Sequence, residues 1–371
     1  MRVLVTGGGT GGHIYPALAI AKGIKAQNPE AEILFVGTAR GMEAEIIPRE
    51  GFAYRSVTVQ GLPRKRASLR SLTAVFKTTK GSLEAYKILR EFKPTVVVGT
   101  GGYVCGPVVM VAAFLKIPTL IHEQNVFPGF TNRVLARIVN KTAVTFPESK
   151  GYFTPKADIV VTGLPIRPEI LDARREDGIS SLSLDKDKFT VLVTGGSQGA
   201  STLNKAMVEV IDRACGLSDI QIVYTTGQAG YDETLRELAA RGIDLVNCGN
   251  IIVKPYLYNM AEALSASDLV ICRAGATTIA EITARGLPSI LIPYPYAAGN
   301  HQEFNAQSLV KNGAAVMILD RDLSGENLTK TVRSLLDNRP GLAAMADRAK
   351  QLGKPEAAKR LLEIIEELNG K

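Results

Sequence analysis

A histidine at the end of a glycine-rich run is the first candidate for acid–base chemistry. The run 7–13 reads GGGTGGH, which puts His13 at the end of a turn made almost wholly of glycine. An imidazole, whose unperturbed pKa is about 6.5, is well suited to accept a proton near neutral pH. We interpret His13 as a candidate general base. The alternative is that His13 only caps a helix that begins near Pro16.

A second polar cluster follows the apolar run 117–121. It consists of His122, Glu123, Gln124 and Asn125. Polar side chains at the carboxyl end of a buried parallel strand are typical of a ligand site, because open α/β sheets bind ligands at that edge. Glu123 is therefore the alternative base. The cluster could instead cap a helix over 131–139, and His122 could be a buried core histidine.

The second half of the chain contains a candidate nucleotide site. Residues 273–281 read RAGATTIAE, so small residues open a helix whose amides can face a phosphate. The two oxygens of Glu281 could accept the two vicinal hydroxyls of a ribose. Thr278 and Glu281 also match a helix capping box, which is the alternative role. The loop 293–306 offers amide side chains that both donate and accept, which suits sugar hydroxyls.

Two copies of one hexapeptide indicate which elements position these residues. VLVTGG occurs at 3–8 and again at 191–196, and each copy passes from an apolar run through glycines into a helical pattern. A third glycine turn, 100–107, follows the apolar run 95–99. These patterns predict buried parallel strands, each followed by a tight turn and a helix. We expect two doubly wound α/β domains, each with a phosphate-sized notch where backbone amides face an anion.

The same glycines do not predict a nicotinamide or ATP site. The first run satisfies Gly-x-Gly-x-x-Gly, but the following strand, 32–38, ends without the acidic residue that holds a ribose. The strand 221–227 in the second half also ends without one. A phosphate-binding P-loop is excluded because His13 and Ile14 stand where Lys and Ser or Thr should follow.

We also expect no metal and no cofactor. Asp185 and Asp187 match the Asp-x-Asp motif of one class of glycosyltransferases, but they precede their strand instead of following it. We interpret them as a solvated turn. No cluster of metal-ligand residues occurs at the expected sheet edges.

Length and composition indicate two domains. The 371 residues exceed one ordinary core, and 46% hydrophobic with 22% charged residues is typical of a globular protein. We expect an N-terminal domain over 1–163, a linker over 164–188, a C-terminal domain over 189–342, and a helical segment over 343–371 that packs back on the N-terminal domain.

Cysteine usage and hydropathy indicate a reducing compartment. The four cysteines, at positions 105, 215, 248 and 272, form no Cys-x-x-Cys pair, so we expect free thiols. The chain reaches Gly7 without the apolar core of a signal peptide, and no apolar run approaches transmembrane length. We therefore expect neither a leader nor a spanning helix.

The net charge of +8 is concentrated in one stretch. Between Thr58 and Lys93, nine basic side chains stand against Glu84 and Glu91, which gives a net charge of +7. Apolar residues recur there at helical spacing, namely Leu69, Leu72, Val75, Phe76 and Leu83. The stretch could be an ordinary surface helix or an amphipathic face, within 62–93, that meets anionic lipid head groups. No aromatic-interleaved motif accompanies the charge, so we expect no nucleic acid as partner.

Five ordered motifs together resemble the MurG family of N-acetylglucosaminyltransferases. They are GGGTGGH (7–13), GTGGY (99–103), HEQN (122–125), GGSQG (195–199) and RAGATTIAE (273–281). The resemblance runs from residue 1 to the C-terminal helix. It implies a GT-B fold, in which two Rossmann-like, doubly wound parallel-sheet domains face each other across a cleft. It also implies transfer of N-acetylglucosamine from UDP-N-acetylglucosamine to the 4-hydroxyl of the N-acetylmuramyl group of lipid I, with inversion, giving lipid II and UDP.

The resemblance also implies roles for individual residues. Glu281 would hold the ribose, Ser197 and Arg167 the diphosphate, and Gln302 with Asn305 the sugar. The uracil would contact Tyr256 and the backbone of Leu257. The remaining donor-binding residues would be Gly275, Ala276, Thr277, Thr278, Ile279 and Ala280, with Thr10, Gly11, Gly12 and Asn125. The acceptor-binding residues would be Thr10, His13, Tyr103, Glu123 and Asn125.

The implied partners are UDP-N-acetylglucosamine, lipid I, an anionic phospholipid surface and other cell-wall synthesis proteins. The implied location is peripheral, on the cytoplasmic face of the bacterial inner membrane. Other classes stay open on the residues alone. These are another UDP-sugar enzyme of the same fold, such as a UDP-N-acetylglucosamine epimerase, a nicotinamide oxidoreductase, and a non-catalytic binding module.

Overall fold

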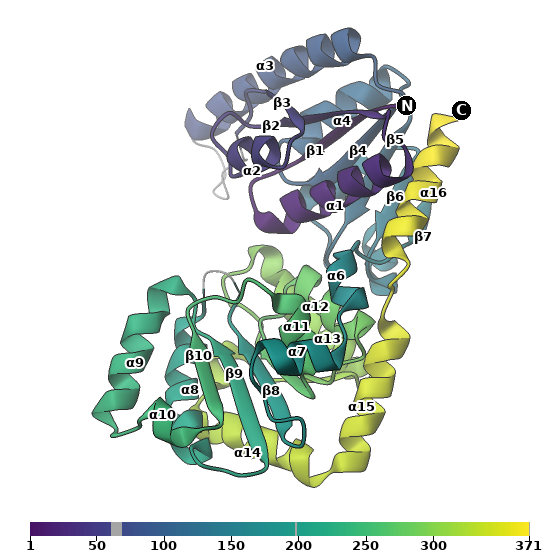
Figure 1. Ribbon diagram of the computed structural model, residues 1–371. Coiled ribbons are helices and arrows are strands. Elements are labelled where there is room, and N and C mark those ends of the chain that lie inside the picture. The colour runs from purple at the N-terminus through teal and green to yellow at the C-terminus, as the bar shows by residue number, and fades with distance from the viewer. Residues whose placement is uncertain (61–68, 197–198, 371) are drawn as a thin grey trace. The chain divides into compact units, whose positions relative to one another are not determined.

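The computed structural model describes residues 1–60, 69–196 and 199–370. The chain divides into two compact units, each built on its own parallel sheet (Figure 1). The N-terminal unit comprises Met1–Ile166 and Pro355–Lys371, and the C-terminal unit comprises Arg167–Lys354.

The sheet of the N-terminal unit has the strand order β3-β2-β1-β4-β5-β6-β7 in the described chain. Every neighbouring pair is parallel. The strands are β1 (Arg2–Gly7), β2 (Glu32–Gly37), β3 (Ala53–Ser56), β4 (Val96–Gly101), β5 (Thr119–Glu123), β6 (Lys141–Val144) and β7 (Ile159–Val161). Because β1, β4 and β5 are neighbours and parallel, the glycine turns after β1 and β4 and the polar cluster after β5 lie at the same sheet edge.

Helices cover both faces of this sheet. They are α1 (Gly11–Gln27), α2 (Glu43–Arg49), α3 (Leu69–Phe92), α4 (Cys105–Phe114), α5 (Phe130–Leu135) and α16 (Ala357–Asn369). Val3 and Val5 of β1 pack in one core with α1 and α16, whereas Leu4 packs in the opposite core with α3 and α4. This alternation explains why three successive residues of β1, Val3, Leu4 and Val5, are apolar. Leu361 and Ile365 of α16 are fully buried, and α16 lies beside α1 (Figure 1).

The described sheet of the C-terminal unit has the order β10-β9-β8-β11-β12-β13 and is also parallel. The strands are β8 (Phe189–Thr194), β9 (Ile220–Thr225), β10 (Ile251–Lys254), β11 (Leu269–Cys272), β12 (Ser289–Leu291) and β13 (Ala315–Met317). The helices are α6 (Pro168–Asp172), α7 (Arg175–Ser181), α8 (Ser201–Ala214), α9 (Tyr231–Ala240), α10 (Leu245–Cys248), α11 (Met260–Ala266), α12 (Ala276–Ala284), α13 (His301–Lys311), α14 (Gly325–Asp337) and α15 (Arg339–Leu352).

The expectation of four free thiols is wrong for one pair of cysteines. Cys215, which follows α8, forms a disulfide with Cys248 at the end of α10. Cys105 and Cys272 are free and buried. The bonded cysteines are 33 residues apart. Their proximity comes from the packing of α8 and α10 around β9 and β10, so no local spacing could have predicted the bond.

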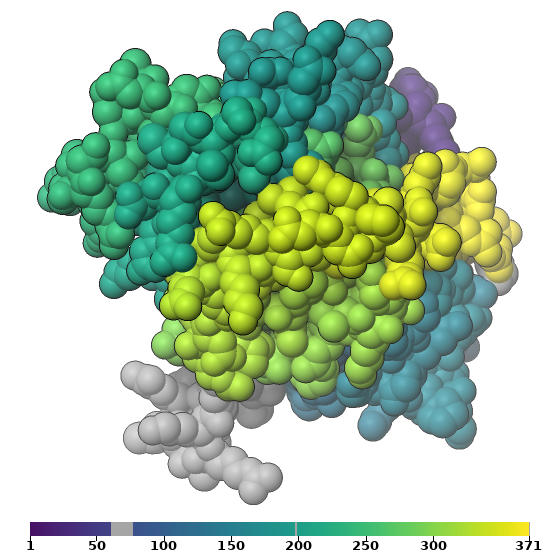
Figure 2. All heavy atoms as spheres, turned by 90° about the horizontal axis from the view of Figure 1, so that it is seen from below, coloured from purple at the N-terminus to yellow at the C-terminus, as the bar shows by residue number. Residues whose placement is uncertain are grey.

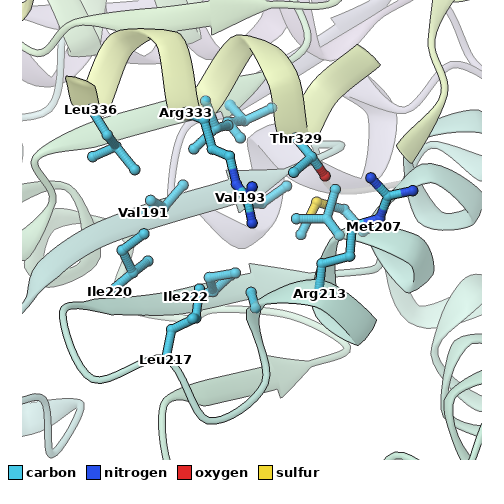
Figure 3. A pocket seen from close by; sticks show the side chains of 14 residues that line it. Val191, Val193, Met207, Arg213, Leu217, Ile220, Ile222, Thr329, Arg333 and Leu336 are labelled. Atoms are coloured by element: carbon cyan, nitrogen blue, oxygen red, sulfur yellow. The ribbon is translucent and has the colours of Figure 1, made fainter. Parts of the chain in front are cut away.

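A small apolar cavity lies in the C-terminal unit, between α8, α14 and the strands β8 and β9 (Figure 3). Its volume is about 50 Å³, and its walls include Val191, Val193, Met207 and Ile222. Arg213, Thr329 and Arg333 also line it, but the other eleven lining residues are apolar, and the volume is too small for a nucleotide. It is therefore no candidate for a nucleotide site. The helices α14 and α15, yellow-green in Figure 2, lie at the surface of this unit.

Candidate active site

The glycine turn after β1 leads directly into α1. Thr10 is the N-cap of this helix, with φ −148° and ψ 155°, and its carbonyl accepts hydrogen bonds from the amides of His13 and Ile14. The helix begins at Gly11, so the alternative that His13 caps a helix starting near Pro16 is wrong. The Oγ1 of Thr100, on β4, donates to the carbonyl of His13 at 2.8 Å. The backbone of His13 is thus fixed from two sides.

The hydrogen bonds of the His13 ring define its tautomer. Its Nδ1 lies 3.0 Å from the carbonyl oxygen of Thr100 and 3.1 Å from Oε1 of Gln124. Both partners are acceptors, so Nδ1 must carry the hydrogen in the neutral ring. The lone pair is then on Nε2. The side chain of His13 is half-buried, and Nε2 makes no hydrogen bond to any described residue. The ring is held in the state that a general base requires.

Gln124 connects His13 to a buried histidine. Its Nε2 donates to the carbonyls of Thr100 at 2.8 Å and His122 at 2.9 Å, and approaches Nδ1 of His122 at 3.1 Å. These acceptors fix the orientation of the Gln124 amide and leave its Oε1 facing His13. The side chain of Gln124 therefore cannot turn without breaking several buried hydrogen bonds.

His122 is a core histidine. It is fully buried, and its Nε2 donates to the carbonyl of Gly163 at 2.9 Å. Burial lowers the pKa of His122, although the Gly163 hydrogen bond and the charge of Glu123 oppose this. The ring is therefore neutral near pH 7, with Nδ1 as an acceptor for Gln124. Of the two explanations for His122 that the sequence leaves open, the structure supports the core histidine.

Glu123 organises the loop that follows β5. Its side chain is 1% exposed. Oε1 accepts from the amide and side chain of Asn125 at 3.0 and 3.3 Å, and Oε2 accepts from the amide of Gly129 at 3.0 Å and from Nδ2 of Asn132 at 2.8 Å. Four donors occupy the roughly four lone-pair directions of a carboxylate. This geometry favours a positioning role for Glu123 over proton transfer.

The two glycine turns of the N-terminal unit pack against each other. Gly102 has φ +83°, and a Cβ there would overlap the carbonyl oxygen of Gly8. Gly101 has φ +107°, and a Cβ there would lie 2.9 Å from the ring of His13. Glycine is required at both positions by conformation and by space. Tyr103, 39% exposed, extends over Gly9 and lies at the same edge as His13.

Glu281 of the C-terminal unit is a buried carboxylate with one cationic partner. It is 6% exposed in α12. Its Oε1 accepts from Nη2 of Arg167 at 3.0 Å and from Nε at 3.3 Å. No described residue donates a hydrogen bond to Oε2. Burial raises the pKa of Glu281, and the adjacent guanidinium lowers it part of the way back. Gly275 is the N-cap of α12, so the capping-box explanation for Thr278 and Glu281 is wrong.

The residues that the sequence assigns to the sugar nucleotide gather in the C-terminal unit, in loops and helix starts after β10, β11 and β12. Tyr256 is 44% exposed, whereas Leu257 is buried. Oε1 of Gln302 accepts from the amide of Tyr294 at 2.9 Å. Asn305 is fully buried and its Nδ2 donates to the carbonyl of Ala274 at 3.3 Å. The first turns of α12 supply residues 275–280. Ser197 lies outside the described residues.

Arg273, the first residue of the motif 273–281, connects two of these loops. Nη1 of Arg273 pairs with Oδ1 of Asp320 at 2.5 Å and donates to the carbonyls of Ile292 and Pro293. Its Nη2 donates to Oγ1 of Thr202 on α8 at 3.1 Å. Arg273 therefore holds the start of the 293–300 loop against α8. Only the fold brings these partners together, so no spacing in the sequence predicts them.

Asp185 and Asp187 form a turn before β8, in which the Asp187 amide donates to the Asp185 carboxylate at 3.0 Å. No group of three or more His, Cys, Asp or Glu side chains with the geometry to hold a metal ion occurs among the described residues. Over the same residues, no helix is both long and apolar enough to cross a bilayer.

Comparisons with known proteins identify the family. The N-terminal domain model of glycosyltransferase family 28 matches residues 3–144, and its C-terminal domain model matches residues 190–361. A protein of Desulforamulus reducens named UDP-N-acetylglucosamine–N-acetylmuramyl-(pentapeptide) pyrophosphoryl-undecaprenol N-acetylglucosamine transferase is 52% identical over 99% of both chains. A protein of the same name from Desulfitobacterium hafniense is 54% identical over 98% of both chains. The chain belongs to glycosyltransferase family 28.

Solved structures agree with this assignment. A crystal structure of MurG from Acinetobacter baumannii matches with a TM-score of 0.80 and 31% identity over 99% of both chains. Together with the two parallel-sheet units, this confirms the predicted GT-B fold. A UDP-N-acetylglucosamine 2-epimerase from Neisseria meningitidis matches with a TM-score of 0.67 at 14% identity, which shows a shared fold and nothing more.

We expect Glu123→Gln to destabilise the N-terminal unit by about 1.5–3 kcal/mol, the usual contribution of hydrogen bonds to a charged group. The amide that replaces one oxygen would point its own hydrogens at two donors. Urea denaturation of both proteins measures the difference. Glu30→Gln, at an exposed position of the same unit, is the matched control. Equal stability of wild type and the Glu123 variant would contradict the positioning role.

Proposed function

We propose that this chain transfers N-acetylglucosamine from UDP-N-acetylglucosamine to lipid I and releases lipid II and UDP. The observation that carries this proposal is the 52–54% identity, over essentially the whole chain, to relatives named for that transfer. The epimerase alternative rests on a likeness of fold at 14% identity, which carries no substrate. An oxidoreductase would need the ribose-binding acid that the strand after the first glycine turn lacks.

Incubation with UDP-N-acetylglucosamine and a short-chain lipid I analogue tests the proposal directly. We expect release of UDP and formation of a disaccharide product in the presence of chelator, because the amides at the start of α12 and the charge of Arg167 would stabilise the leaving diphosphate without a metal ion. Conversion of UDP-N-acetylglucosamine to its 2-epimer without use of the acceptor would overturn the proposal in favour of the epimerase.

We assign His13 as the base of the transfer. The acceptor's 4-hydroxyl attacks the anomeric carbon of the donor, a new C–O bond forms, and the bond to the diphosphate breaks on the opposite face. The hydroxyl proton passes to Nε2 of His13, the nitrogen left with a lone pair when Thr100 and Gln124 engage Nδ1. Tyr103, Thr10 and Asn125 then surround the acceptor, while Glu123 holds the loop that carries Asn125.

We assign the C-terminal unit to the donor. The buried carboxylate of Glu281 has one oxygen not used by Arg167, which suits a ribose hydroxyl. Arg167 is 56% exposed beyond that contact and would add positive charge near the diphosphate.

Amides at the start of α12, residues 275–280, and Ser197 would stabilise the leaving diphosphate. Tyr256 and Leu257 would contact the uracil, Gln302 the sugar, and buried Asn305 would support that loop.

We further propose that the N-terminal unit rests on an anionic membrane surface through α3, α4 and α5. These three helices cover one face of the sheet, and Leu83, Phe114 and Phe130 on them are 64–75% exposed. Lys87 and Arg90 are exposed on α3, and Lys116 and Arg137 are exposed just after the ends of α4 and α5. Exposed apolar side chains among basic ones are typical of interfacial binding. The polyprenyl acceptor supports a peripheral location at a membrane, and the face that we propose is the cytoplasmic one. Arg64, Lys65 and Arg66 of the expected basic face lie outside the described residues.

We predict that His13→Ala lowers the transfer rate about 10²- to 10⁴-fold, the usual effect of losing a general base. Its melting temperature should stay close to that of wild type, because Thr100 bonds the His13 backbone and not only its ring. UDP affinity, measured by calorimetry, should not change. A variant that melts early but transfers at nearly the normal rate would contradict the base assignment.

We predict that Glu281→Gln raises the KM for the donor about ten- to hundredfold, which corresponds to ~1.5–3 kcal/mol for a hydrogen bond to a charged group. The raised pKa of Glu281 adds a pH dependence. If the ionised carboxylate binds the ribose, UDP affinity of wild type should rise as pH increases through that pKa. The Gln variant should lose this dependence. Glu233→Gln, exposed on α9, is the control, and an unchanged profile in both variants would contradict the assignment.

The raised pKa of Glu281 also predicts how the stability of the protein changes with pH. The folded-state pKa of Glu281 lies above the ordinary value of 4.5, so the folded unit binds the proton more tightly than the unfolded chain. The resulting stabilisation is present below pH 4.5 and is lost as pH rises through the raised pKa. As pH rises over this range, the melting temperature of wild type should fall relative to that of Glu281→Gln. A constant difference between the two proteins would show that Arg167 fully compensates the buried charge.

We predict that reversing Lys87, Arg90 and Lys116 to Glu strongly reduces flotation with vesicles that contain anionic phospholipid. Each basic side chain near such a surface contributes about 1 kcal/mol. Reversal of Lys22, Lys25 and Lys359, which lie on α1 and α16 on the other face of the sheet, is the matched control. Equal flotation of both triple variants and wild type would contradict the assigned face.

A further inference from the structure

A buried carboxylate that has no role in the chemistry above lies directly beneath the first glycine turn. Glu43 is the first residue of α2 and is 1% exposed. Its Oε2 accepts from the amide of Gly9 at 3.1 Å, and its Oε1 accepts from the amide and Oγ1 of Thr38 at 3.1 and 2.7 Å. No Lys, Arg or His of the described chain forms an ion pair with it. A buried charge is costly, so its donors must be well placed to retain it.

Three glycines provide the space for this carboxylate. A Cβ on Gly8 would lie 2.5 Å from its Oε1, and a Cβ on Gly37 would lie 2.6 Å from its Cγ. A Cβ on Gly41 would overlap both carboxylate oxygens. None of these three glycines has a positive φ, so their backbone conformations are open to other residues. Glycine is needed there because the backbone of two turns closes around the side chain of Glu43.

Glu43 contacts residues that lie just before His13 in the sequence. Gly9, whose amide it holds, has φ +85° and lies beneath the ring of Tyr103. The next residue, Thr10, is the N-cap of α1, and His13 follows in the first turn of that helix. On the other side, the carbonyl of Thr38 accepts from Oη of Tyr54 at 2.6 Å. Glu43 therefore joins the glycine turn to a second loop that is itself anchored.

We propose that Glu43 is a positioning residue for the transfer. Its carboxylate holds the turn 7–12 in the conformation that presents His13 and Tyr103 to the acceptor, and this rests on the proposed role of His13.

Glu43→Gln tests the proposal with little change in size. Both oxygens of Glu43 accept from donors, so either orientation of the glutamine amide turns its hydrogens toward Gly9 or Thr38. We expect kcat/KM for the acceptor to fall by about tenfold to 10²-fold, the effect of a misplacement of roughly 1 Å. The KM for UDP-N-acetylglucosamine should not change. Glu45→Gln, at an exposed position of the same helix, is the matched control.

Amide hydrogen exchange separates this proposal from the proposed function. The Gly9 amide should exchange slowly in wild type and in the Glu45 variant, and at least tenfold faster in Glu43→Gln. This readout needs no substrate. If exchange responds as expected but wild type shows no transfer to lipid I, the proposed function fails while the contact stands. If exchange accelerates and kcat/KM is unchanged, Glu43 is merely structural and the proposal is overturned.

A second variant covers the case in which Glu43→Gln does not fold. Gly41→Ala leaves the charge in place but pushes a methyl group against the carboxylate. We expect it to lower kcat/KM for the acceptor and to speed exchange of the Gly9 amide, as Glu43→Gln would, with the KM for UDP-N-acetylglucosamine unchanged. Faster exchange of the Gly9 amide with an unchanged kcat/KM would overturn the proposal.

Discussion

The candidate base depends on two hydrogen bonds, which Nδ1 of His13 makes with Thr100 and Gln124. They require three elements to end at one edge. His13 follows β1, Thr100 lies in β4, and Gln124 follows β5. Because these strands are parallel neighbours, their carboxyl ends meet without any long connection. The glycine turns then allow the backbones to approach closely enough for side-chain contact, and the core histidine beneath them fixes the glutamine between the two rings.

Three buried carboxylates differ in how many hydrogen-bond donors stabilise their charge, and the difference follows their proposed roles. Glu123 is surrounded by four donors and Glu43 by three, and both brace loops next to His13. Glu281 has Arg167 on one oxygen only. Its raised pKa shows that the protein leaves the cost of burial partly uncompensated. Incomplete compensation is what we expect of a carboxylate whose last partner is a ligand.

Much of the framework could be predicted from the sequence, because its signals are local. The apolar runs before glycines correspond to β1, β4, β8 and β11, and the family resemblance gave the GT-B fold. Short strands with weak patterns, such as β12 and β13, gave no signal of their own. The capping-box explanation for Glu281 failed because the helix starts earlier, with Gly275 as its N-cap, and turns the carboxylate inward.

What the sequence could not predict depends on contacts between distant segments. Glu43 is one of many glutamates until the fold places Gly9, 34 positions away, on its carboxylate. The disulfide between Cys215 and Cys248 also joins residues far apart in the sequence, as does the ion pair between Arg273 and Asp320. His122 was a candidate for chemistry from its position alone, and only its burial and its bond to Gly163 assign it to the core.

The tautomer of His13 tests the central claim most directly. The chain has three histidines, so nitrogen-15 resonances of the imidazole rings can be assigned with single His122 and His301 variants. In the neutral ring of His13, we predict a hydrogen on Nδ1 and an unprotonated Nε2. A neutral ring with the hydrogen on Nε2 would contradict the base role of His13, because its lone pair would then face two acceptors and could not receive a proton from a substrate.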